Sequence, residues 1–98
     1  MQQISSVNNA TIKKLAKLKQ KKYRDEENRY LIEGFHLFEE AVKAGKKYQY
    51  VLGTEEAFDQ VNEDYDIDLD GKNVILINKA IARHLSSTKN SQEIFMVL

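Results

Sequence analysis

The chain has 98 residues with a formal net charge of zero; 42% are hydrophobic, 31% are charged, and none is cysteine. This length and composition predict one small soluble globular domain, residues 1–98, and argue against a disordered chain. The lack of cysteine excludes a disulfide framework and favours the cytoplasm, and no apolar run resembles a signal peptide or a membrane span.

The first predicted element is a helix over residues 9–23, where apolar residues recur near helical spacing and Asn8 or Asn9 could serve as N-cap. All seven charged residues among the first 24 are basic, whereas the rest of the chain carries a net charge of −7. Four basic residues at positions i, i+4, i+8 and i+11 would form a ridge on one face of this helix: Lys13, Lys17, Lys21 and Arg24.

Strand-like and helix-like segments then alternate. A strand at 30–32 leads through Gly34 into a helix with the apolar stripe Leu37, Phe38, Ala41 and Val42, which ends at Gly45. Further strands are expected at 48–52, 74–77 and 94–98, with helices around 57–61 and from Asn78 to Leu85. This order predicts a small three-layer α/β sandwich with about four strands and a largely parallel sheet.

The residues alone predict no active site, cofactor site or metal site. The turn Glu33-Gly34 could present backbone N–H groups to a phosphate, but a lone glycine favours a simple tight turn. The acidic residues Asp66, Asp68 and Asp70 resemble a calcium loop, yet the twelfth position from Asp66 is Ile77 rather than glutamate. A solvated acidic segment is the better interpretation.

The basic ridge is the strongest functional signal, because clustered Lys and Arg attract phosphate backbones and release counterions. Its alternative is a solvated lysine-rich helix, and charge alone leaves both open. Arg29 could add charge, and Tyr23 and Tyr30 could add stacking surfaces.

Three blocks together resemble the N-terminal substrate-binding domain of SpoU/TrmH-type RNA 2′-O-ribose methyltransferases. Residues 4–13 resemble I-[ST]-S-x-x-N-P-x-[IV]-K, with Ala10 in place of proline. Arg24, residues 30–34 and Glu40-Ala41 resemble R…F-L-[VI]-E-G-x-x-x-[VL]-x-E-A. Residues 85–94 resemble L-S-x-T-x-x-P-Q-G-[VI], with Ser91 in place of proline and Glu93 in place of glycine.

The resemblance implies a fold like that of ribosomal and kink-turn RNA-binding proteins. In the family, a separate knotted domain binds S-adenosylmethionine, carries the catalytic arginine and forms the homodimer. That domain is absent from residues 1–98 and would follow Leu98. We therefore expect no catalytic residue, cofactor site or methyl transfer in this chain, and a parent enzyme that depends on S-adenosylmethionine.

The sequence thus predicts an RNA-recognition domain of an enzyme that methylates ribosomal or transfer RNA. The expected RNA-binding residues are Asn9, Lys13, Lys14, Lys17, Lys21, Arg24, Arg29 and His36. Two alternatives remain: a protein-interaction module whose acidic residues 55–70 dock a basic partner, and a stand-alone RNA-binding domain without a methyltransferase partner.

Overall fold

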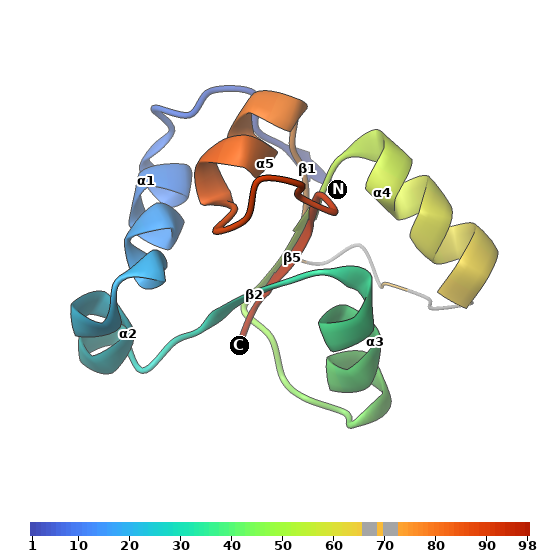
Figure 1. The fold of residues 1–98 in the computed structure, drawn as a ribbon, viewed down its shortest axis with the longest axis horizontal. Coiled ribbons are helices and arrows are strands. Elements are labelled where there is room, and N and C mark those ends of the chain that lie inside the picture. Colours follow the sequence, from blue (N-terminus) through green and yellow to red (C-terminus); the bar gives the residue numbers. More distant parts are fainter. Residues whose placement is uncertain (66–68, 70–72) are drawn as a thin grey trace.

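A five-stranded sheet lies between two layers of helices in the computed structural model of the protein (Figure 1), which describes residues 1–65, 69 and 73–98. The strands are Gln2–Gln3 (β1), Leu31–Glu33 (β2), Tyr50–Gly53 (β3), Val74–Leu76 (β4) and Ile94–Val97 (β5). The α-helices are Ala10–Ala16 (α1), Lys21–Glu27 (α2), Phe35–Lys43 (α3), Glu55–Gln60 (α4) and Lys79–Leu85 (α5). A 3₁₀ turn, Lys17–Lys19 (η1), follows α1, and a π-helical turn, Val61–Tyr65 (η2), follows α4.

The strand order is β1-β4-β3-β5-β2, which confirms the predicted α/β class and adds one strand to the expected four. The added strand, β1, pairs two exposed glutamines with β4 and has no apolar pattern that would reveal it. β1 and β3 run parallel to β4, whereas β5 runs antiparallel to both β3 and β2. Four of the five described strands therefore run in one direction, in line with the predicted largely parallel sheet, and β5 is reversed.

The loop over residues 86–93 explains this reversal. It carries the chain from the end of α5 back to the carboxyl ends of β3 and β2, where the Thr54 amide donates to Glu93 and the Gly34 amide donates to Ile94. β5 therefore starts where the neighbouring strands end. Sequence periodicity reveals a strand but not its direction.

Two apolar clusters cover the two faces of the sheet. One cluster joins α1, η1 and α5 to Leu52, Ile75 and Phe95, and the other joins α3 and α4 to alternating strand residues that include Val51 and Ile94. Figure 1 shows α1 and α5 on one side of the strands and α3 and α4 on the other. Successive strand side chains point to opposite faces, so each central strand contributes to both clusters.

The helix predicted over residues 9–23 is wrong as one continuous element. After η1, Gln20 adopts an extended conformation with φ −102° and ψ 132°, and α2 starts anew at Lys21. Leu18 is buried, but no apolar residue follows until Tyr23, so nothing holds a longer helix against the sheet. The basic residues are consequently divided between two helices and form no single straight ridge.

The buried stripe of α3 also differs from the prediction. Phe35, Phe38 and Ala41 face the core, while Leu37 is 47% exposed. The helix begins directly after Gly34, so Phe35 occupies the position three residues before Phe38 on the same face. Gly45, with φ 68°, ends this helix as expected.

Asp66, Asp68 and Asp70, the acidic residues compared with a calcium loop, lie outside the described residues. Among the helices that the structure describes, none combines the length and the apolarity that crossing a membrane requires.

Among the glycines that the structure describes, Gly34 should be the most sensitive to substitution. Its φ of 107° and ψ of 151° fall in a region essentially restricted to glycine, and an added Cβ would lie 2.9 Å from Gln92 Oε1. We expect Gly34→Ala to lower the free energy of unfolding by about 1–3 kcal/mol in chemical denaturation. Gly45→Ala is the control, because its φ of 68° is also left-handed but its Cβ would meet nothing within 4 Å. A larger loss at Gly45 would contradict this account.

Candidate nucleic-acid interface

The basic segment, residues 10–27, is interrupted at Gln20, whose extended backbone separates α1 and η1 from α2. The Nζ atoms of Lys17 and Lys22 lie 5.3 and 5.5 Å from the ring centroid of Tyr23, one from each side of the break. Two ammonium groups therefore meet at one aromatic ring, a combination suited to contacts with phosphates and bases. Lys22 was not among the expected RNA-binding residues, although the adjacent tyrosine was a signal for it.

Arg24 has a structural role that its charge did not reveal. One guanidinium nitrogen, Nη1, donates to the carbonyl oxygens of Leu18 at 3.1 Å and Lys19 at 2.9 Å. These are carbonyls at the end of η1, where the break at Gln20 interrupts the helical hydrogen bonds. Arg24 therefore stabilises the break, while its other guanidinium nitrogens make no hydrogen bond to the residues that the structure describes.

The lysines of the segment differ in how far they are engaged. Lys21 forms a 2.7 Å ion pair with Asp25, but both side chains are largely exposed and the pair is screened by water. Lys13 and Lys14 are exposed and have no ion-pair partner among the residues that the structure describes. These two, with Lys17, are the cations on α1 and η1 most accessible to an external phosphate.

Asn9 and His36 lie in different settings from the lysines. Asn9 Oδ1 accepts from the Thr11 amide at 2.8 Å and the Ile12 amide at 3.3 Å, which confirms it as the N-cap of α1. His36 lies on α3, which covers the opposite face of the sheet from α1, and its Nε2 is 3.2 Å from Glu40. The fold therefore does not bring His36 together with α1.

Arg29, by contrast, is brought beside α1. It follows the end of α2 and lines, with Lys14, a pocket of about 300 Å³ between α1 and the start of β3. Arg29 and Lys14 are far apart in the sequence, so helical spacing did not predict that they would lie close together.

The turn at Glu33-Gly34 is held by side chains of the loop over residues 86–93. Ser86 Oγ lies 2.8 and 3.0 Å from the two carboxylate oxygens of Glu33, and its hydroxyl group donates a hydrogen bond to this carboxylate. Gln92 Oε1 accepts from the Phe35 amide at 2.8 Å, at the first turn of α3. The amides of Gly34 and Phe35 are thus already bonded within the protein, which favours the tight-turn interpretation.

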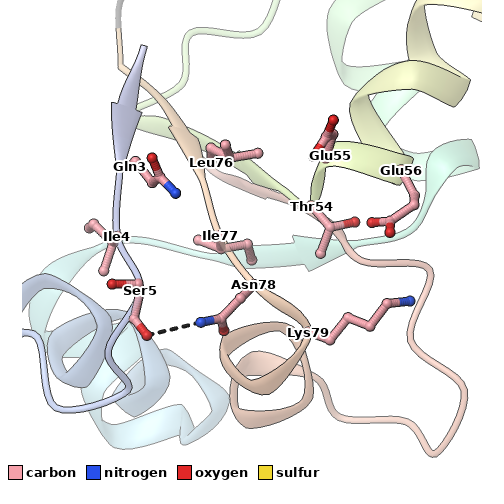
Figure 2. Close-up of a pocket in the computed structure, with 10 residues that line it drawn as sticks. All are labelled: Gln3, Ile4, Ser5, Thr54, Glu55, Glu56, Leu76, Ile77, Asn78 and Lys79. Atoms are coloured by element: carbon pink, nitrogen blue, oxygen red, sulfur yellow. Dashed lines mark hydrogen bonds between the residues drawn. The ribbon is translucent and has the colours of Figure 1, made fainter.

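A second pocket, of about 280 Å³, lies at the carboxyl ends of β1, β4 and β3 (Figure 2). Figure 2 shows Asn78 reaching the backbone of Ser5, with a 2.9 Å hydrogen bond from Nδ2 to the carbonyl oxygen. The rim carries Glu55, Glu56 and Lys79, so carboxylates predominate. This balance of charge disfavours an RNA phosphate there.

The chain matches a known family of RNA methyltransferase domains. The family model of the MRM3-like substrate binding domain matches residues 9–96. The chain belongs to this family. No curated protein matches the chain. The family match confirms the resemblance to the substrate-binding domains of SpoU/TrmH-type methyltransferases that the three sequence blocks predicted.

Solved structures share the fold of this MRM3-like domain. An RNA 2′-O ribose methyltransferase is 30% identical, with a TM-score of 0.79 over 97% of this chain and 36% of its own. An rRNA methyltransferase from Sinorhizobium meliloti, also solved with AdoMet bound, is 24% identical, with a TM-score of 0.75 over 98% of this chain. The alignment covers 36% of that chain, and 35% of the chain in the AdoMet-bound structure.

A third structure, a TrmH-family protein from Porphyromonas gingivalis, is 22% identical, with a TM-score of 0.65 over 94% of this chain and 35% of its own. The MRM3-like domain therefore spans about a third of the length of each of these proteins. At 22–24% identity the last two show only that the fold is the same.

The capping role of Arg24 can be separated from its charge by stability measurements. Arg24→Ala removes two charge-assisted hydrogen bonds and should lower the free energy of unfolding by about 1–3 kcal/mol. Lys21→Ala is the control on the same helix, where loss of an exposed ion pair should cost less than about 1 kcal/mol. Equal losses in urea titrations would refute the capping role.

Glu93 offers a second test, because its φ of 64° is left-handed where the family pattern has glycine. Its Oε1 accepts from Thr54 Oγ1 at 2.8 Å, and its Oε2 lies 3.5 Å from Lys79 Nζ. Glu93→Ala and Glu93→Gly both remove these contacts, but only glycine relieves the backbone strain. We expect the glycine variant to be more stable than the alanine variant by about 1 kcal/mol in thermal unfolding. An alanine variant of equal or greater stability would be the contrary result.

Proposed function

We propose that the chain binds RNA and positions it for 2′-O-ribose methylation by a catalytic domain outside residues 1–98. The observation that carries the proposal is the placement of the basic segment within a domain of the substrate-binding family. Lys13, Lys14 and Lys17 are exposed on α1 and η1, and Lys17 and Lys22 converge on Tyr23. The phosphate backbone of RNA is the natural ligand for such a surface.

The charge distribution favours an approach of RNA from the α1 side of the domain. The acidic helix α4 packs on the sheet face opposite α1, and its residues Glu55, Glu56 and Asp59 are exposed. RNA would be repelled from that side and attracted to the basic residues of α1, η1 and the start of α2, whereas the last three residues of α2 are acidic. The bound nucleic acid would therefore approach the domain from the α1 side.

The parent enzyme, in this proposal, uses S-adenosylmethionine, modifies ribosomal or transfer RNA, acts in the cytoplasm and dimerises through its catalytic domain. The AdoMet-bound structure of the S. meliloti rRNA methyltransferase supports the choice of methyl donor. Residues 1–98 would supply substrate recognition and no catalytic residue. Methyl transfer to RNA by residues 1–98 alone, incubated with S-adenosylmethionine, would overturn this division of labour.

The salt dependence of RNA binding tests the proposal. Each phosphate contact in single-stranded RNA should contribute about 0.7 to the slope of log affinity against log salt. The triple variant Lys13→Gln, Lys17→Gln, Lys21→Gln should therefore reduce the slope by about 2 and weaken binding, as measured by fluorescence anisotropy.

The matched control replaces three exposed lysines outside α1 and α2, Lys46, Lys47 and Lys89, with glutamine. It removes the same charge and should change the slope much less. Equal effects of the two triple variants, or RNA affinity that does not vary with salt, would contradict the proposed interface. Loss of binding to a basic protein after neutralising Glu55, Glu56 and Asp59, with RNA binding absent, would favour the protein-interaction alternative.

A further inference from the structure

The pocket beside Arg29 has the size and lining of a site for a small ligand. Its volume is about 300 Å³, at the lower end of the range for ligand sites. Its apolar floor is formed by Leu15 and Leu18, which are 4% and 5% exposed. Its polar lining comes from α1, the turn after α2 and the start of β3, and consists of Thr11, Lys14, Glu27, Arg29, Gln49 and Tyr50.

These polar side chains lack bonding partners among the residues that the structure describes. None of them makes a hydrogen bond or an ion pair through its side chain within the described part of the chain. Arg29 gives the strongest indication of a ligand site. Its side chain is half-buried and has lost part of its hydration without gaining an acceptor among the described residues. Arg24, on the neighbouring helix, shows the usual outcome, with two carbonyl acceptors. An anionic ligand would supply what Arg29 lacks.

The arrangement of groups matches one nucleotide. Lys14 and Arg29 place two cations at the pocket, against the single carboxylate of Glu27. The cations fit a phosphate, while Leu15, Leu18 and Tyr50 offer apolar and aromatic surface to a base. Glu27, which only accepts hydrogen bonds when ionised, fits a base with an exocyclic amino group.

We propose that this pocket takes one unpaired nucleotide of the bound RNA, with its phosphate on Lys14 and Arg29 and an amino-bearing base against Leu15, Leu18 and Tyr50. The inference rests on the proposed function and makes it more specific. The basic segment would hold the backbone of any RNA, whereas the pocket would require a nucleotide that is not in a duplex.

The test uses the 98-residue chain labelled with ¹⁵N, the four ribonucleoside monophosphates, and a short RNA as single strand and as duplex. CMP, AMP and GMP should shift the amide signals of Leu15, Leu18, Arg29 and Tyr50 more than UMP does. The single strand should bind more tightly than the duplex. Arg29→Gln should weaken binding of the single strand about tenfold, as loss of a charge-assisted hydrogen bond predicts.

Arg83→Gln is the matched control, since Arg83 is exposed on α5 and carries the same charge. It should weaken binding by less than about threefold. Lys14→Gln, at an exposed position, is a second pocket variant that leaves the core intact. It should also weaken RNA binding more than the control does.

The outcomes separate this inference from the proposed function. Salt-dependent RNA binding that Arg29→Gln and Arg83→Gln weaken equally would overturn the pocket and leave the basic segment as the interface. Amide shifts with mononucleotides but no binding of RNA would overturn the assignment to RNA and the proposed function with it. Equal shifts from all four mononucleotides would overturn the role given to Glu27.

Discussion

The position of β5 is the constraint on which the sheet depends. This strand is buried along its whole length and pairs with both β3 and β2, so it joins the edge strand to the parallel strands. It can enter between them only because the loop over residues 86–93 returns to their carboxyl ends. Side chains hold that loop: Ser86 bonds Glu33, Gln92 bonds the first turn of α3, and Glu93 bonds Thr54. Ser86, Glu33 and Gln92 match the family pattern, whereas the bond between Glu93 and Thr54 depends on a residue that replaces the usual glycine.

Local patterns predicted the elements well and their relations less well. The apolar run at 74–77 and the stripe from Ile12 to Leu18 both became core, because burial of apolar surface decides where such segments lie. The reversal of β5 could not be predicted, since it depends on hydrogen bonds between residues distant in sequence. The break at Gln20 was missed for a local reason: no glycine or proline marks it, and it is stabilised by Arg24 from the following helix.

The charge of the candidate site could be predicted from the sequence, but the positions of its side chains could not. The lysines of residues 13–22 predicted a candidate phosphate-binding segment, because an uneven distribution of charge is visible in any sequence. Charge does not show which residues of the candidate site already have partners. Asn9 and Arg24 each bond to backbone groups that only the fold brings near them. The proximity of Arg29 and Lys14 likewise arises from the turn at Asn28, whose left-handed conformation ends α2.

The two carbonyl oxygens held by Arg24 affect how substitutions in this segment are interpreted. A change at Arg24 removes a positive charge and, at the same time, frees the backbone that fixes the relative positions of Lys17 and Lys22 around Tyr23. Lysine would keep the charge, but its ammonium lacks the planar fork of the guanidinium. In an alanine scan for RNA binding, this residue would therefore score as a strong contact even if no RNA atom ever touched it.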